Sequence, residues 1–241
     1  MRKIVCAWTG ILLGCLMANA QPKPIYQDAS LPIEKRVEDA LARMTVEEKI
    51  QLIHANGGYC SGGVPRLGIP GNFPTDGPVG LRPEMYWSGW TQAGMSTDSC
   101  TAFPALVCLA ATWNPAMGKL FGHAYSEEAL YRNKNIILGP GVNIFRTPMN
   151  GRNFEYMGED PYLASRMAVA YIQGVQDNHV AACVKHFAVN NQETNRYSIN
   201  TLVDERTLHE LYLPAFKAAV QEGKVWAVMG AYSQYNGQHC C

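Results

Sequence analysis

The chain alternates between short apolar runs and segments in which apolar residues recur every three or four positions. The runs are rich in alanine and β-branched residues, which is typical of strands buried on both faces of a parallel sheet. They predict strands over the ranges 67–80 (a short strand with its loop), 105–112, 136–144, 180–187 and 225–231. The helical spacing predicts helices over the ranges 32–44, 46–56, 115–132, 161–176 and 205–221.

Local signals mark the starts of two of these helices. Thr45 is an expected N-cap, and Glu48 three residues later completes a capping box. Asp160 is a second expected N-cap, followed by Pro161 at the first helical position. In both signals a side chain accepts from backbone amides of the first turn, and Pro161 in addition has a backbone already suited to that turn.

Regular alternation of strand and helix indicates a parallel α/β fold rather than separate layers of sheet and helix. About five or six βα units are visible, fewer than the eight that close a barrel. We therefore predict an incomplete (β/α)8 TIM-type barrel that occupies residues 21–241. The chain stops just past the last predicted strand, at Gln238-His239-Cys240-Cys241, with no closing helix, so we expect it to represent part of a larger domain.

The first 20 residues have the pattern of an export signal. Arg2 and Lys3 precede an apolar stretch, and a small-x-small cleavage signal ends at Ala20. Leu12-Leu13-Gly14-Cys15 also resembles a lipoprotein cleavage box, which would place a lipid anchor on Cys15. Both alternatives predict an exported protein, periplasmic or extracellular.

Composition argues against several other classes of protein. The 20 basic and 20 acidic residues balance, and loss of Arg2 and Lys3 with the signal would give a formal charge of −2. We therefore expect no nucleic-acid partner, and with no second long apolar segment we expect no membrane span. The spacing of the cysteines fits no zinc site, so we expect neither metal nor cofactor. Cys108 and Cys183 lie in apolar runs and are predicted core residues.

Polar clusters follow several of the predicted strands. The most informative is Lys185-His186, at the end of the apolar run that begins at residue 180. In a β/α barrel the carboxyl ends of the strands carry the chemistry, so these side chains are expected to converge on one rim. The other candidates at that rim are Asp76, Arg82, Arg152, Glu155 and Tyr232, with Trp87, Trp90 and Trp113 as further stacking surfaces. Fixed donors beside carboxylate acceptors suit a polyhydroxylated ligand.

Four motifs in order, DGPVGLR, GPGVNIFRTPMNGRNFEYMGEDP, KHFAVNNQETNR and VMGAYSQYNG, resemble the N-terminal barrel domain of glycoside hydrolase family 3, particularly its β-glucosidases. The resemblance runs from about Ile33 to the last residue. It implies that hydroxyls of the glycone sugar are bound by Asp76, Arg82, Arg152, Lys185 and His186. It also places Tyr232 close to the nucleophile and gives Glu155 and Met229 supporting positions behind the binding residues.

The resemblance further favours the glucosidase branch. The branch that removes N-acetylglucosamine carries KHFPGHG, whereas here Phe187 is followed by Ala188-Val189-Asn190-Asn191. Ala231 and Ser233 stand where the family usually has Ser and Asn, a small departure. The implied reaction is retaining hydrolysis of terminal β-D-glucosyl residues, and the implied substrates are β-linked glucosides or oligosaccharides.

The catalytic carboxylates are not expected within this chain. The family takes its nucleophilic Asp from a Ser-Asp-Trp motif on a later strand, and no such motif occurs here. Its acid/base Glu comes from a second domain, an α/β sandwich. A retaining glycosidase needs both groups on either side of the scissile bond. We therefore expect both to lie beyond Cys241 and this chain to be inactive alone.

Two other functions stay open at this point. One is a sugar-binding remnant without catalysis. The other is an aldolase-type barrel in which Lys185 forms a Schiff base, although that function leaves the other motifs without a role. Glu127-Glu128 is interpreted as a solvated helix face, and Glu193 with Arg196 as a loop ion pair of little energetic weight.

Overall fold

The computed structural model describes residues 23–55, 60–82 and 99–240, and the chain divides into two compact units, residues 1–53 and 54–241. The elements of the first unit are η1 (Ile25–Gln27), α2 (Ile33–Arg43) and α3 (Val46–Leu52). Both long helices were predicted, and α3 ends earlier than expected. The capping box is confirmed, because Thr45 accepts from the Glu48 amide and Glu48 accepts from the Thr45 amide.

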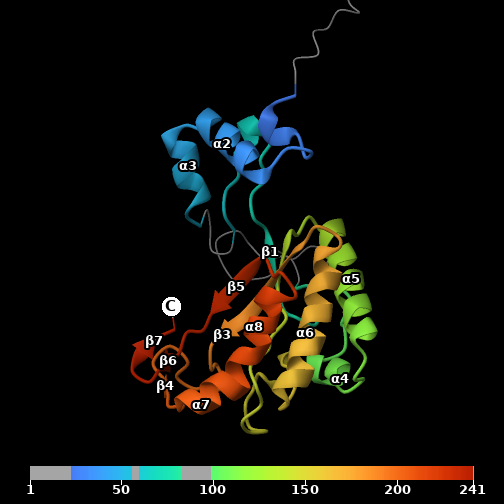
Figure 1. Ribbon diagram of the computed structural model, residues 1–241, viewed down its shortest axis with the longest axis vertical. Helices are drawn as coiled ribbons and strands as arrows, with labels where there is room; N and C mark the ends of the chain where they lie inside the picture. The colour runs from blue at the N-terminus through green and yellow to red at the C-terminus, as the bar shows by residue number, and fades with distance from the viewer. Residues whose placement is uncertain (1–22, 56–59, 83–98, 241) are drawn as a thin grey trace, which may run out of the picture. The chain divides into compact units, whose positions relative to one another are not determined.

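A parallel sheet forms the centre of the second unit (Figure 1). Its strands, in the spatial order β1-β2-β3-β5, are β1 (Pro74–Asp76), β2 (Ile136–Leu138), β3 (Ala181–Phe187) and β5 (Ala227–Gly230). The helices between them are α4 (Leu106–Ala110), α5 (Pro115–Tyr131), α6 (Pro161–Gln176), α7 (Glu205–Thr207) and α8 (Leu213–Gln221). Sequential parallel strands joined by helices are the repeating unit of a (β/α)8 barrel, so the predicted fold class is confirmed.

Two predicted strands are corrected by the structure. The range 105–112 contains helix α4, whose buried residues Leu106, Leu109 and Ala110 follow helical spacing. A short apolar run does not by itself distinguish a strand from a buried helix. Cys108 is exposed on this helix, so its predicted place in the core was wrong, whereas Cys183 is buried as expected.

The predicted strand 136–144 is regular only over β2, which ends before Gly139-Pro140. Proline has no backbone N–H to continue a ladder. The next residues still run beside β3, since Lys185 donates its amide to the Pro140 carbonyl and accepts from the Val142 amide. The segment therefore leaves the sheet gradually and carries the residues that follow toward the strand ends.

The predicted helix 205–221 is divided by a π-helical segment, η4 (Leu208–Tyr212), between α7 and α8. Pro214 lies at the start of α8 and lacks the amide that would continue the α-helical ladder. The remaining short elements are η2 (Pro65–Leu67), η3 (Asn153–Glu155), β4 (Asn200–Thr201), β6 (Gln234–Tyr235) and β7 (Gln238–His239). The last three form a small second sheet that was not predicted.

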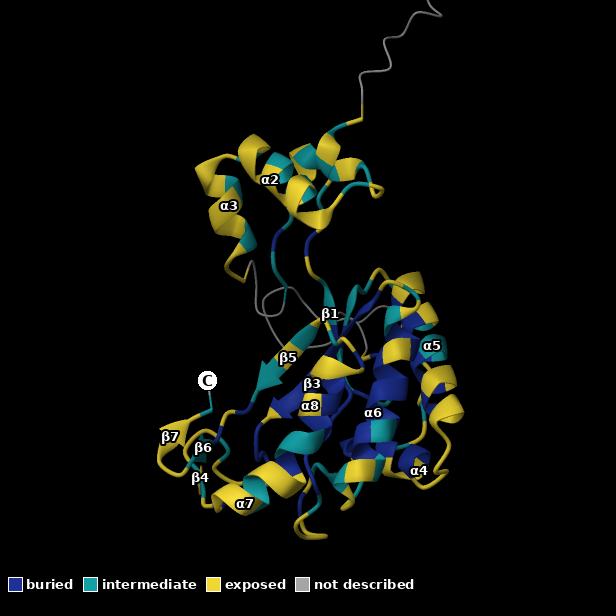
Figure 2. Cartoon of the chain, viewed as in Figure 1, coloured by how far each residue is buried: buried dark blue, intermediate teal, exposed yellow. Residues whose placement is uncertain are grey.

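The core of the second unit lies between the sheet and the layer formed by α5, α6 and α8, drawn in dark blue in Figure 2. Helix α6 has its Asp160 cap and Pro161 as predicted, and most of its residues are buried. It packs closely on α5 because glycines stand where the two helices meet. A Cβ on Gly174 would lie 2.1 Å from the Lys119 carbonyl oxygen, and one on Gly122 would lie 2.3 Å from that of Tyr171.

Gly174→Ala is therefore expected to force α5 and α6 apart and to lower the free energy of unfolding by about 1–3 kcal/mol. Gly151→Ala is the matched control, because a Cβ there would have no atom within 4 Å. Thermal melts followed by circular dichroism measure the difference. Equal melting temperatures for the two variants would contradict the close packing of these helices.

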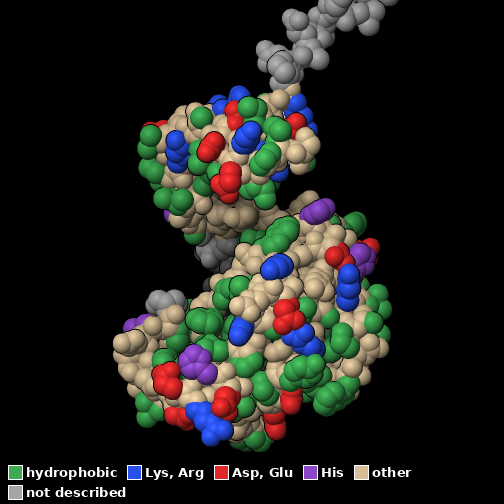
Figure 3. All heavy atoms as spheres, viewed as in Figure 1, with side chains coloured by type: hydrophobic (Ala, Val, Ile, Leu, Met, Phe, Trp, Pro, Cys, Tyr) green, Lys and Arg blue, Asp and Glu red, His purple; other side chains and the backbone are tan. Residues whose placement is uncertain are grey.

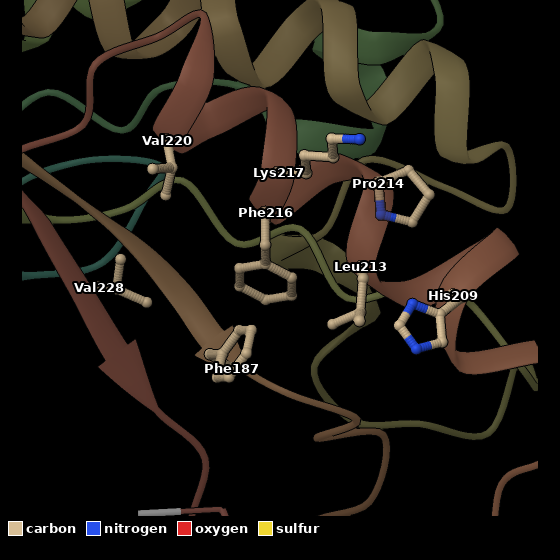
Figure 4. Close-up of a pocket in the computed structure, with 8 residues that line it drawn as sticks. All are labelled: Phe187, His209, Leu213, Pro214, Phe216, Lys217, Val220 and Val228. Carbon is tan, nitrogen blue, oxygen red and sulfur yellow. The ribbon is translucent and has the colours of Figure 1, made fainter. Parts of the chain in front are cut away.

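Two surface features complete the description. On the face shown in Figure 3, basic and acidic side chains lie interspersed. An apolar groove lies where α8 faces β3 and β5, lined mainly by Phe187, Leu213, Phe216, Val220 and Val228 (Figure 4).

In the part of the chain that the structure describes, we find no helix with the length and apolar character needed to cross a membrane.

Candidate functional site

The predicted site residues come from the carboxyl ends of neighbouring strands. Asp76 is the last residue of β1, and Lys185 and His186 lie near the end of β3. Arg152 and Glu155 belong to the segment that follows β2. Parallel strands bring these ends to one edge of the sheet, so the expected convergence is found, as a continuous network of ion pairs and hydrogen bonds.

Lys185 is the centre of this network. Its side chain is 2% exposed, and its Nζ lies 3.3 Å from Asp76 Oδ1 and 3.2 Å from Glu155 Oε2. A buried ammonium is costly unless it is paired and hydrogen-bonded. The two carboxylates supply that compensation, and each is in turn held by a second cation.

Asp76 is a partly exposed acceptor of the network, next to Lys185. Its Oδ1 also accepts from the Gly77 amide at 2.8 Å, and its Oδ2 faces Arg82 Nη1 at 3.2 Å. Burial raises the pKa of the Asp76 carboxyl, but Lys185, the Gly77 amide and Arg82 lower it more, so the pKa lies below its ordinary value. The side chain is 28% exposed, which leaves an ionised acceptor open to a ligand.

Glu155 joins Lys185 to Arg152. Its side chain is 3% exposed; Oε2 faces Lys185 and Oε1 accepts from Arg152 Nε. Arg152 extends the network through Nη1, 3.3 Å from Glu193 Oε1, and through Nη2, 3.0 Å from His186 Nε2. Burial lowers the pKa of Arg152, but Glu155 raises it more, so the guanidinium stays charged.

His186 is buried and neutral. Burial, together with the charges of Arg152, Lys185 and Arg196, lowers its pKa to about 2. Its Nδ1 lies 3.1 Å from the Tyr156 hydroxyl. His186 follows Lys185 directly, yet both side chains belong to the same network, because the register of β3 against β5 shifts between Val184 and Phe187. Such an irregularity redirects side chains that would otherwise point to opposite faces.

The neutral state of His186 makes folding sensitive to acid. The folded ring stays unprotonated down to about pH 2, whereas in the unfolded chain it takes a proton below its ordinary pKa of 6.5. The unfolded state therefore gains protons first, and stability falls as pH drops, by about 1.4 kcal/mol per pH unit below that value.

Urea unfolding of the protein and of its His186→Gln variant at pH 7 and pH 5 measures this contribution. We expect the wild type to lose about 2 kcal/mol more than the variant between these pH values. An equal loss of unfolding free energy in both proteins would show that folded His186 already takes up its proton between pH 7 and pH 5.

Tyr232 lies at the edge of the network, 48% exposed. Its ring centroid is 4.9 Å from that of Tyr197, and the Arg196 guanidinium lies 5.0 Å from the centroid of each ring. Arg196 Nη1 pairs with Glu193 Oε2 at 3.1 Å, which connects Tyr232 to Arg152 through Glu193.

The remaining predicted residues are less closely involved. Met229 is half-buried in β5. Trp113 is 70% exposed just before α5, and Trp87 and Trp90 lie outside the described residues, as does the predicted signal at 1–20. Glu127 is exposed as interpreted, but Glu128 accepts from the Thr101 amide at 2.9 Å and is not simply a solvated side chain.

Sequence reasoning missed three residues of the network. Glu193 was assigned a minor ion pair with Arg196, and its bond to Arg152 across the fold was not foreseen. Asn143 holds the His186 backbone on both sides, through its amide nitrogen at 3.0 Å and its oxygen at 2.9 Å. Tyr156 was not singled out, although its position next to Glu155 in a motif-rich segment was an available signal.

The arrangement combines partly open carboxylates with fixed cations and a neutral histidine. Carboxylates and cations can bind hydroxyls by charge-assisted hydrogen bonds, and their mutual ion pairs hold them in place without a ligand. Among the residues the structure describes, no group of three or more His, Cys, Asp or Glu side chains is arranged to hold a metal ion.

Comparisons with known proteins agree with this geometry. The family model described as "Glycosyl hydrolase family 3 N terminal domain" matches residues 89–241. A β-glucosidase of Bacteroides ovatus is 60% identical over 93% of this chain and 30% of its own length. The thermostable β-glucosidase B of Acetivibrio thermocellus is 44% identical over 85% of this chain and 27% of its own length.

Among solved structures, β-glucosidase 3B of Thermotoga neapolitana in complex with glucose superposes with a TM-score of 0.75 at 40% identity. The match covers 85% of this chain and 30% of that one. The chain therefore spans less than a third of the length of these relatives.

Proposed function

This chain belongs to glycosyl hydrolase family 3, and from that membership we propose that the complete protein is an exported, exo-acting β-glucosidase that retains the configuration of the sugar it releases. Here the complete protein means this chain with any residues that its gene encodes beyond Cys241. The chain itself supplies the side chains that bind the non-reducing glucosyl unit.

The observation that carries this proposal is the environment of Asp76. An ionised carboxylate, partly open to solvent and flanked by Lys185 and Arg82, accepts hydrogen bonds from two sugar hydroxyls while the cations donate to their oxygens. Arg152 and His186 extend the same polar wall. A hexose offers such hydroxyls along one edge, at the spacing of neighbouring side chains on the rim.

We place the nucleophile and the general acid outside residues 1–241. In the network the carboxylates of Asp76, Glu155 and Glu193 are each paired with at least one cation, and these ion pairs suit binding rather than covalent attack. The similarity to proteins more than three times as long as the matched region is in keeping with this assignment.

The Schiff-base alternative loses support from the geometry. Lys185 Nζ is held between two carboxylates, at 3.3 and 3.2 Å. An amine that is protonated to pair with them has no lone pair with which to attack a carbonyl. A sugar-binding protein without catalysis would use the same binding residues, and a measurement of the activity of the complete protein distinguishes it from an enzyme.

The complete protein is expected to hydrolyse an aryl β-glucoside and to release β-glucose first, as seen by NMR of the fresh product. An aryl N-acetyl-β-glucosaminide should be cleaved far more slowly, and an aryl β-xyloside tests tolerance of the missing hydroxymethyl group. Preference for the N-acetylglucosaminide, or release of α-glucose, would contradict the proposal. Residues 21–241 alone should show no turnover.

Export is a separate part of the proposal, supported by the pattern of residues 1–20. The expected mature N-terminus is Gln21, and cleavage before an acylated Cys15 is the alternative. Mass spectrometry of the protein recovered from its native host distinguishes the two, and an uncleaved Met1 in a cytosolic fraction would contradict export.

A further inference from the structure

Tyr156 is a fully buried residue that follows η3 and contacts His186. Its hydroxyl lies 3.1 Å from His186 Nδ1 and 3.0 Å from the Asn190 carbonyl oxygen. Burial raises the pKa of Tyr156 well above its ordinary value, so the hydroxyl keeps its proton. Nothing in the motif comparison gives this residue a role.

The hydrogen bonds on either side of the His186 ring determine which nitrogen carries the proton. A carbonyl oxygen only accepts, so the Tyr156 hydroxyl donates to Asn190 and turns a lone pair toward His186 Nδ1. That nitrogen must then carry the hydrogen. At the other end, Arg152 Nη2 only donates, so Nε2 must be bare. Both ends of the ring independently require the same tautomer.

The backbone and ring of His186 have little freedom to escape this arrangement. Asn143 bonds both the amide and the carbonyl of His186, and the imidazole meets the Tyr156 ring edge to face at 6.1 Å and 79°. Without the Tyr156 hydroxyl, the proton on Nδ1 would have no partner in a dry site. The proton could move to Nε2, where it would point at the Arg152 guanidinium.

We propose that Tyr156 is a positioning residue, which holds His186 in the tautomer whose bare Nε2 accepts from Arg152 and so fixes Arg152 for binding of the glycone. The inference rests on the proposed function for the purpose of Arg152, but the tautomer itself is a property of the chain. Arg152 has other partners in Glu155 and Glu193, and the bond to His186 is the one that orients its second terminal nitrogen.

The test uses Tyr156→Phe in the complete protein, labelled with ¹⁵N-histidine. Spectra of the ring nitrogens should place the proton on Nδ1 in the wild type and at least partly on Nε2 in the variant. The His186→Gln variant identifies the His186 signals by their loss. A variant that keeps the proton wholly on Nδ1 overturns the proposal.

Kinetics separate positioning from a merely structural effect. Tyr156→Phe should lower kcat/KM about tenfold, as for loss of one buried hydrogen bond. In the His186→Gln background the glutamine oxygen takes the place of Nε2 and needs no tautomer, so Tyr156→Phe should add less than about twofold. Equal losses in both backgrounds overturn the proposal.

Tyr212→Phe is the matched control, because Tyr212 is also fully buried and its hydroxyl accepts from Arg146 at 2.9 Å, away from His186. It should leave the His186 spectrum unchanged; the same spectral change as in Tyr156→Phe would assign that change to general loosening and overturn the proposal. If the complete protein cleaves no β-glucoside, the proposed function fails, while the spectra still decide the role of Tyr156.

Discussion

Replacement of Asp76 by alanine in the complete protein is expected to lower kcat/KM for an aryl β-glucoside by roughly 30- to 1000-fold. Asp76 is an ionised acceptor that is partly open to a ligand. The variant removes its hydrogen bonds to sugar hydroxyls, and the loss of such charged hydrogen bonds costs about 2–4 kcal/mol. It also breaks the ion pairs of Asp76 with Arg82 and with Lys185, so that the buried ammonium keeps its pairing with Glu155 but loses that with Asp76.

Glu127→Ala is the control for this prediction, because Glu127 is exposed on α5 and faces His123 at 3.6 Å. It should change the rate little. Lys185→Ala and His186→Ala should also lower kcat/KM, with losses that do not add to that of Asp76→Ala, because Lys185 pairs with Asp76 and His186 holds Arg152 in the same network. Circular dichroism checks that the variants fold, and near-normal activity in folded Asp76→Ala would disprove the site assignment.

Glu155→Gln is expected to have the largest effect on stability and to lower the free energy of unfolding by about 3–5 kcal/mol. Glu155 is 3% exposed and pairs with both Lys185 and Arg152. The amide keeps the shape of the side chain but removes the charge that compensates two buried cations. For a unit of this size the melting temperature should fall by roughly 6–20 °C.

Glu222→Gln is the matched control for that variant. Glu222 accepts two hydrogen bonds from Arg166, each at 2.6 Å, but its side chain is 49% exposed. Exposed ion pairs contribute at most about 1 kcal/mol. Thermal melts give the melting temperatures of the two variants. A similar small fall of the melting temperature in both would mean that water reaches Glu155 in solution.

The sequence by itself determined the class of fold and the location of the site. Apolar runs identified β3 and β5 nearly in place, whereas β1 and β2 each lie inside a longer predicted segment. Capping signals at Thr45 and Asp160 were confirmed because a cap depends on residues three positions apart. Lys185 and His186 were identified from their place at a strand end, which is a local property.

Only the tertiary structure decided which partners these residues have. Helix α4 was predicted as a strand, because its short apolar run shows burial without showing the backbone conformation. Glu193 contacts Arg152 across 41 positions, and Tyr156 reaches Asn190 across 34. Such contacts depend on the path of the loops after β2 and β3, and this path follows from packing of the whole unit rather than from any local pattern. Residue types can therefore be read along the chain, whereas the charge and tautomer that each one holds are determined by neighbours that only the fold brings together.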